Sequence, residues 1–255
     1  MMNKNGVSMC LFSTKGGVGK TINTMNLAGI CEHLDKRVLI IDFDLYTGDI
    51  ALYNNKACKK DIYDLALDLD HHKYNGISNY VTKIDNYIDI LPAPIDPRYA
   101  SKINHIYINK IIKDAKEVYD VVLCDTNHAL NEISLSVLDS VDRTILITTN
   151  DPMDIKGIRT LISIFKDNDY NKYKVLLNNS RDPFKDYFTL YDIKKLIKHN
   201  IDYSLSNELY IKDIEKYVMD GLIITLQNKF PSLYMNDYRV YLTILTDMLE
   251  GGKNE

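Results

Sequence analysis

The stretch Lys15-Gly16-Gly17-Val18-Gly19-Lys20-Thr21 decides the fold of this 255-residue chain. It follows the apolar run Val7 to Ser13, which predicts a buried strand, and it precedes apolar residues at helical spacing from Ile22 to Leu34. Glycines let successive backbone N–H groups point into one concavity, and the following helix adds the positive end of its dipole. The sequence therefore predicts a strand, a phosphate-binding loop and a helix.

Two side chains of this loop have the chemistry of a nucleoside triphosphate site. Lys20 supplies a point charge for the β- and γ-phosphates, and the Thr21 hydroxyl can ligate Mg²⁺. A dinucleotide-binding G-x-G-x-x-G pattern that began at Gly17 would need glycine where Ile22 stands. The common phosphate loop has glycine five residues before its second glycine, and here Thr14 stands at that position. We therefore expect a nucleoside triphosphate with Mg²⁺, held by a variant loop.

Short apolar runs alternate with helical patterns along the rest of the chain. The predicted strands are Val38 to Ile41, Ile88 to Leu91, Val121 to Cys124, Arg143 to Thr148 and Val175 to Leu177. The first of these runs is so short and so continuously apolar that it is typical of a strand buried on both faces, which indicates a parallel sheet. We expect one α/β domain over residues 1–255, with a core from about 7 to 250: a P-loop NTPase with a doubly wound, mainly parallel sheet flanked by helices.

Helical spacing also predicts helices at about Asn104 to Lys116, Met153 to Asp167 and Asp237 to Glu250. A polar stretch from about 60 to 85, opened by a short helix at Asp61, is expected to form a surface excursion. The last helix has acidic residues against a lone Arg239, so we expect its apolar stripe to pack on the body of the protein and not to enter a membrane. The stripe consists of Tyr238, Tyr241, Leu242, Leu245, Met248 and Leu249.

Carboxylates follow two of the predicted strands. Asp42-Phe43-Asp44 ends one strand and Asp125 ends another, and ligands of doubly wound sheets lie outside the carboxyl ends of the strands. Two carboxylates at i and i+2 beyond a strand end point the same way, which suits a shared site for a metal ion and its water. The alternative is that these carboxylates only cap a turn or a strand end.

Composition narrows the class of protein. With 45% hydrophobic and 26% charged residues, the chain is typical of a globular domain. With a net charge of −4, the chain lacks the overall positive charge of proteins that bind DNA non-specifically, although a local basic face stays open as an alternative. The four cysteines form no C-x-x-C pair, which excludes zinc ribbons, thioredoxin motifs and an obvious iron–sulfur ligand set. Without a signal peptide or a long apolar run, we expect a cytoplasmic protein with no transmembrane segment.

The loop with Lys15, together with Asp42-Phe43-Asp44 and Asp125, resembles the deviant Walker-A ATPases of the MinD/ParA superfamily over about residues 7 to 250. The resemblance implies a slow, Mg²⁺-dependent hydrolysis of ATP to ADP and phosphate. It also implies a homodimer that sandwiches two ATP molecules, with Lys15 reaching across the two-fold axis to the partner's nucleotide. ATP would then control dimerisation.

The same resemblance implies roles for individual residues. Catalytic roles fall to Lys15, Lys20, Asp42 and Asp44, where Asp44 orients the attacking water or the water shell of the metal with Asp42 behind it. The magnesium site would be formed by Thr21, Asp42, Asp44 and Asp125. The residues expected to contact the nucleotide are Lys15, Gly16, Gly17, Val18, Gly19, Lys20, Thr21 and Ile22, with Asn178 or Asn179 at the adenine.

Several looser stretches are similar to the CpaE/TadZ-like pilus-assembly branch of the superfamily. They are Gly48 to Tyr53, Leu91 to Pro94, Leu130 to Leu135 and Asp142 to Thr148. They imply a spatial switch that positions a pilus or secretion apparatus and is recruited by a protein partner to a pole or to the inner membrane face. The alternatives are a partition or division-site ATPase of the ParA/MinD type, and a nucleotide-binding scaffold with weak turnover. A ParA-like partition ATPase would bind DNA as its ATP dimer, and DNA is a possible partner of this chain that the sequence does not favour. A bacterial tyrosine kinase is disfavoured because the 19 tyrosines are dispersed.

Overall fold

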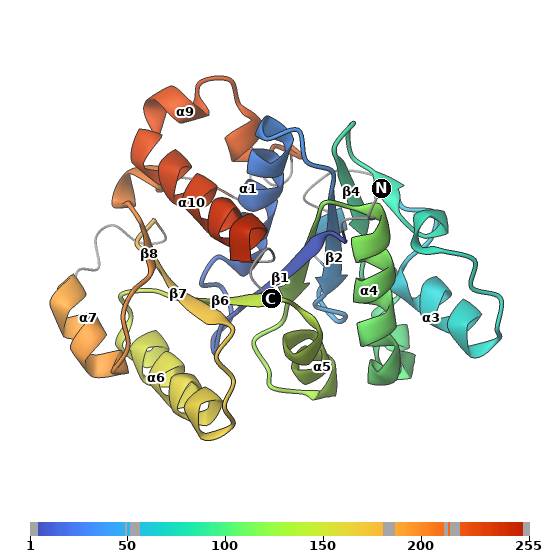
Figure 1. Cartoon of the computed structure of the whole chain (residues 1–255), viewed down its shortest axis with the longest axis horizontal. Helices are drawn as coiled ribbons and strands as arrows, with labels where there is room; N and C mark the ends of the chain where they lie inside the picture. Colours follow the sequence, from blue (N-terminus) through green and yellow to red (C-terminus); the bar gives the residue numbers. More distant parts are fainter. Residues whose placement is uncertain are drawn as a thin grey trace.

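The computed structural model describes residues 5–48, 50–51, 57–180, 187–211, 214 and 220–251. Within these residues one eight-stranded sheet forms the centre of the molecule, in the strand order β3-β4-β2-β5-β1-β6-β7-β8 (Figure 1). The short β3 is antiparallel to β4, and every other neighbouring pair is parallel. The strands are β1 (Val7–Phe12), β2 (Val38–Phe43), β3 (Thr82–Lys83), β4 (Ile88–Leu91), β5 (Val121–Thr126), β6 (Arg143–Thr148), β7 (Tyr173–Asn178) and β8 (Tyr203–Leu205).

Helices cover both faces of the sheet, which confirms the predicted doubly wound fold. One face packs against α1 (Lys20–His33), α9 (Phe230–Leu233) and α10 (Met235–Gly251). The other face packs against α3 (Ile62–Asp70), α4 (Ile108–Val118), α5 (Glu132–Ser140), α6 (Pro152–Asp167) and α7 (Leu190–Ile197). Short 3₁₀ segments, η1 (Ile77–Asn79), η2 (Pro97–Lys102), η3 (His105–Tyr107), η4 (Asn207–Leu209) and η5 (Ile224–Leu226), connect these elements.

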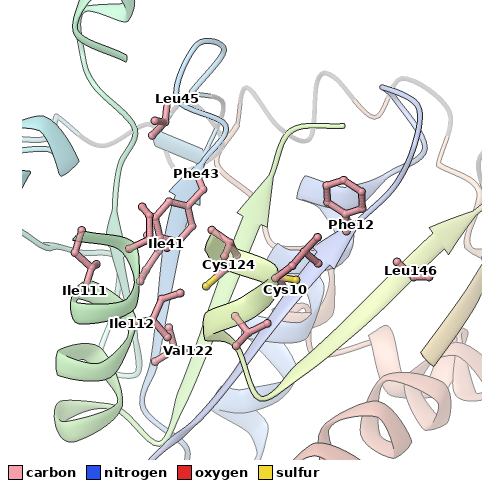
Figure 2. Close-up of a cluster of buried hydrophobic side chains, with 14 of the residues drawn as sticks. Cys10, Phe12, Ile41, Phe43, Leu45, Ile111, Ile112, Val122, Cys124 and Leu146 are labelled. Carbon is pink, nitrogen blue, oxygen red and sulfur yellow. The ribbon is translucent and has the colours of Figure 1, made fainter. Parts of the chain in front are cut away.

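Alternation along the strands divides the core into two layers. Cys10 and Phe12 of β1 point toward α4 to α6, whereas Met9 and Leu11 point toward α1. Figure 2 shows part of the first layer, in which side chains from β1, β2, β5 and β6 lie on the same face of the sheet and Ile111 and Ile112 of α4 lie beside those of β2 and β5. Both layers are fully buried, as expected for the continuous apolar strands of a parallel sheet.

The predicted helices are present, with shifted ends. The helix expected from Asn104 begins as the 3₁₀ segment η3 and becomes α-helical only at Ile108. Asp61 caps α3 through a reciprocal capping box with Asp64. The surface excursion predicted for 60–85 is only partly correct, because Tyr80 and the apolar side of α3 are buried in the core.

The C-terminal helix α10 packs on the body of the protein, as its apolar stripe predicts. Tyr241, Leu245 and Met248 are buried in the layer that contains α1, and the two helices lie side by side in Figure 1. Among the described helices, none is long and apolar enough to span a membrane.

Candidate functional site

The phosphate-binding loop connects β1 to α1, at the carboxyl edge of the central strands. Its last residue before the helix, Gly19, has a φ of 99°, in the left-handed region. A Cβ atom at this position would lie 2.6 Å from Asn178 Nδ2, so both the backbone and the available space require glycine. Among the described residues, no side chain caps α1 at Gly19. The first N–H groups of the helix therefore remain available to an anion.

Lys20 is held inside this loop with its ammonium group pointing at polar atoms. Its side chain is only 8% exposed, and Nζ donates a hydrogen bond to Ser13 Oγ at 3.1 Å. Burial lowers the pKa of Lys20, while the carboxylates of Asp125 and Asp44 act in the opposite direction. A buried cation in a concavity of N–H groups provides strong attraction for a phosphate.

Thr21 and Asp125 meet where α1 begins and β5 ends. The Thr21 hydroxyl donates to Asp125 Oδ2 at 2.7 Å, and Thr24 Oγ1 lies 3.4 Å from Asp125 Oδ1. Burial raises the pKa of Asp125 to about 6, although the Thr21 hydrogen bond and the Lys20 charge lower it. The described residues contain no ready-made cluster of three metal-ligating side chains. A hydroxyl and a carboxylate at this spacing suit Mg²⁺, which usually takes few protein ligands beside phosphates and water.

Asp42 lies opposite Asp125 in the β2–β5 pair and faces the same end of the sheet. Its carboxylate accepts hydrogen bonds from the backbone N–H groups of Asp44, at 3.0 Å, and Ile50, at 3.3 Å. Burial raises the pKa of Asp42, and the nearby Asp125 charge adds to this effect. Asp42 thus makes the bonds of a turn cap and orders the loop that carries Asp44. Its predicted catalytic and metal roles stay predictions, as do those of Asp44.

Lys15 lies beside the loop and contacts the start of α6. Its Nζ is 3.5 Å from Asp151 Oδ1 and 3.7 Å from Asp154 Oδ1. Asp151 also caps α6 by accepting from the N–H groups of Met153 and Asp154. The Lys15 side chain is 44% exposed, so it is accessible to another molecule. Its predicted reach into a partner subunit stays a prediction.

The two candidate adenine contacts differ in their bonding. Asn178 Nδ2 donates to the Val18 carbonyl at 2.9 Å, and Asn178 Oδ1 accepts from Ser180, so this side chain supports the phosphate loop. Asn179 Nδ2 donates to Ser204 Oγ at 3.2 Å. Both line a cavity of about 960 Å³ together with Lys15, Ser206 and Asp237. The cavity is large enough for a nucleoside beside the phosphate loop.

The sequence analysis did not predict the buried side chains that hydrogen-bond to the phosphate loop and to the cavity lining. Asn23 of α1 donates to the Gly19 carbonyl at 2.7 Å, and Tyr241 of α10 donates to Asn23 at 2.7 Å. Asp237 accepts from both the N–H and the hydroxyl of Ser206, at 2.6 and 2.7 Å. A polar residue such as Asn23 on the buried side of a helix was the available signal, because buried amides need partners.

A protein-family model described as AAA domain matches residues 7–177. The chain belongs to this family. Within it, the chain is a member of the MinD/ParA superfamily of P-loop ATPases. This MinD/ParA protein is 24% identical to the chromosome-partitioning ATPase Soj of Treponema pallidum over 227 residues, which are 87% of this chain and 82% of that relative. Several further curated relatives are matched over less than two thirds of their length.

Two solved structures share the fold of this MinD/ParA protein. A ParA family ATPase from Chlorobium tepidum TLS superimposes with a TM-score of 0.80 at 19% identity, over 93% of this chain and 98% of that one. A septum site-determining protein MinD from Pyrococcus horikoshii OT3, complexed with Mg-ADP, gives a TM-score of 0.79 at 18% identity, over 98% and 99%. The comparisons confirm the predicted superfamily and leave the CpaE/TadZ branch unconfirmed.

Proposed function

We propose that this chain binds Mg²⁺-ATP and hydrolyses it slowly to ADP and phosphate, as a switch between monomer and dimer. One observation carries the proposal: the Lys20 ammonium and the Thr21–Asp125 pair converge where α1 begins, beside the Asp42 and Asp44 carboxylates. The Mg-ADP complex of the MinD from Pyrococcus horikoshii, which has the same fold, supports a magnesium nucleotide as the ligand.

Each residue of the site has a distinct task in this proposal. The N–H groups from Gly16 to Ile22 hold the phosphate oxygens, and Lys20 neutralises their charge. Thr21 and Asp125 would hold Mg²⁺, which supplies charge neutralisation on the β- and γ-phosphates. Asp44 orients the attacking water at the loop edge, and Asp42 fixes the turn that carries it. Asn179 is the better candidate for the adenine, because the Asn178 amide already bonds to the loop.

Dimerisation is proposed to exchange the partners of Lys15. In the single chain, the Lys15 ammonium group lies 3.5 Å from Asp151, which is partly exposed, and 3.7 Å from Asp154, whose side chain is only 3% exposed. The Lys15 side chain itself is 44% exposed, so a γ-phosphate in a second subunit, which carries more negative charge than a carboxylate, would compete for this ammonium group. ATP, but not ADP, would then favour a homodimer with two sandwiched nucleotides.

For the cellular role, we propose a cytoplasmic protein that a partner recruits to a pole or to the inner membrane face, in pilus or secretion-system assembly. The support is the set of CpaE/TadZ-like stretches in the sequence. One of these, Gly48 to Tyr53, includes residues 49, 52 and 53, which lie outside the described residues.

A ParA-like partition role is the second candidate, and one surface favours it. Lys194, Lys195, Lys198 and His199 line a shallow groove of about 520 Å³ at α7. Lys166 of α6 adds its ammonium group there by donating to the Lys198 carbonyl at 3.3 Å. A local basic patch of this kind could contact nucleic acid phosphates despite the net charge of −4.

Light scattering with Mg²⁺-ATP and with Mg²⁺-ADP tests the switch, and DNA retention at increasing salt separates the two roles. We expect a dimer with ATP only, and no DNA retention that depends on ATP. ATP-dependent retention that falls steeply with salt would favour partition. If the solution mass is the same with ATP and with ADP and no ATP turnover is measurable, only the nucleotide-binding scaffold remains as a function.

A further inference from the structure

Tyr241 is 222 residues from Gly19 in the sequence, yet two hydrogen bonds connect them in the structure. The Tyr241 hydroxyl donates to Asn23 Oδ1 at 2.7 Å, and Asn23 Nδ2 donates to the Gly19 carbonyl at 2.7 Å. All three groups are in the part of the molecule where α10 packs against α1. The C-terminal helix is therefore bonded to the phosphate loop through a single side chain.

The amide of Asn23 depends on Tyr241 for its orientation. An asparagine amide can turn over, which exchanges its donor and acceptor ends. Tyr241 occupies the acceptor end with its own proton, so the donor end faces Gly19. Asn26 Nδ2 donates to the Tyr241 oxygen at 3.1 Å, which directs the hydroxyl proton toward Asn23. Asn23, Asn26 and Tyr241 are all buried, so water cannot replace these partners.

The orientation of the Gly19 peptide matters for anion binding. A phosphate loop turns its N–H groups inward, so its carbonyls point outward and need donors of their own. Asn178 supplies a donor to Val18, and Asn23 supplies two to Gly19, its backbone N–H at 3.0 Å and its side-chain Nδ2 at 2.7 Å. The same two amides approach the position of a Gly19 Cβ from their separate elements, at 2.6 and 3.2 Å. They hold the left-handed residue between them.

The other end of the cavity is bonded to the same helix. Asp237 lies four residues before Tyr241 and so faces the same side of α10. It accepts two hydrogen bonds from Ser206, which lines the cavity next to the phosphate loop. The helix α10 is therefore bonded both to the phosphate loop, through Tyr241 and Asn23, and to the cavity lining at Ser206, through Asp237.

We propose that Tyr241 is a positioning residue for nucleotide binding, which acts through Asn23 to hold the Gly19 peptide in its anion-binding orientation. The proposal rests on the proposed function, because it assumes that the loop binds a nucleotide. It assigns the C-terminal helix a part in the site that the loop motif does not contain.

Tyr241→Phe and Tyr203→Phe provide a matched pair of variants. Each removes one tyrosine hydroxyl that connects α10 to the rest of the molecule, since Tyr203 of β8 donates to Asp247 of α10. Only Tyr241 is bonded to Asn23. The dissociation constants of Mg²⁺-ADP and Mg²⁺-ATP are measured by calorimetry for the wild type and both variants, well below their melting temperatures. Amide hydrogen exchange at Val18 to Lys20 is followed in the nucleotide-free proteins.

We expect Tyr241→Phe to weaken nucleotide binding about tenfold, because the nucleotide must then order a Gly19 peptide that the wild type already holds in place. Exchange at Val18 to Lys20 should accelerate in this variant, and Tyr203→Phe should bind within about twofold of the wild type. Equal affinities in all three proteins, or equal weakening in both variants, would overturn the positioning role while leaving the proposed function intact. If the wild type itself binds neither nucleotide, the proposed function fails and the positioning role fails with it.

Discussion

The Thr21 hydroxyl donates to Asp125 Oδ2 across 2.7 Å and so joins the first turn of α1 to the carboxyl end of β5. These residues are 104 positions apart in the chain. The pair gathers an oxygen ligand and a buried carboxylate at one point, next to the Lys20 ammonium group. Four experiments test what this arrangement implies.

Asp125→Asn tests the buried carboxylate through its pH dependence. Burial raises the pKa of Asp125 to about 6 in the folded protein, from its ordinary value of 3.8. Between these values the unfolded chain releases its proton first, so the free energy of unfolding falls as the pH rises, and the loss is complete above pH 6. Asp125→Asn has no titrating carboxyl at this position, so its free energy of unfolding does not fall in this way. Its stability relative to the wild type, measured by urea unfolding without Mg²⁺, should rise by on the order of 2 kcal/mol from pH 4 to 7. If the free energies of unfolding of the two proteins change in parallel with pH, the raised pKa of Asp125 is contradicted.

Gly19→Ala tests the geometry of the phosphate loop. Alanine would be strained in the left-handed backbone conformation of this position, and its Cβ would lie 2.6 Å from Asn178 Nδ2. We therefore expect the variant to lose about 2 kcal/mol in the free energy of unfolding and to bind Mg²⁺-ADP at least tenfold more weakly. Gly76→Ala is the control, because Gly76 also has a positive φ of 111° but has no atom within 4 Å of an added Cβ. It should lose stability through backbone strain and keep its nucleotide affinity. If both variants lose nucleotide affinity equally, the loss comes from lower overall stability and not from the geometry of the phosphate loop.

Lys15→Ala tests the proposed role of this residue in the dimer. The contact with Asp151 is partly exposed and contributes little, but the Asp154 carboxylate is buried and loses the ammonium group beside its Oδ1, so we expect the free energy of unfolding to fall by on the order of 2 kcal/mol in a chain that stays folded. The ATP-dependent dimer should nevertheless disappear in light scattering. Lys110→Ala, which removes the exposed pair with Asp114 on α4, should keep the dimer. A Lys15→Ala protein that still dimerises with ATP would refute the role of this lysine across the two-fold axis.

Asp44→Ala tests the proposed water-orienting role. The bonds of Asp44 within its turn are made by its backbone, whose carbonyl accepts from Thr47 and Gly48, so the turn should survive loss of the carboxylate. We expect ATP binding to persist while turnover falls at least a hundredfold and the ATP dimer accumulates. Asp42→Ala should behave differently and destabilise the protein, because two backbone N–H groups lose their acceptor. Unchanged phosphate release by Asp44→Ala would exclude the role.

Much of the site was predictable because its parts are local in sequence. The residues from Gly16 to Thr21 carry their backbone geometry with them, and a parallel strand that ends in a carboxylate delivers it to the carboxyl edge of the sheet. This is why Lys20, Thr21 and Asp125 converge as the motif predicts. The hydrogen bonds of Asp42 were harder to predict, because a carboxylate that follows a strand can either cap a turn or bind a metal ion.

The sequence by itself determined the phosphate loop, the doubly wound sheet and the end of the sheet at which the chemistry lies, because glycine positions and apolar periodicity act over a few residues. Only the tertiary structure decided which distant side chains support that loop. Lys15 meets Asp151 because α6 starts beside the loop, and Asn23 meets Tyr241 because α10 packs on α1. Such pairs, up to 218 residues apart, are created by the packing of helices on the sheet, and no local pattern encodes them.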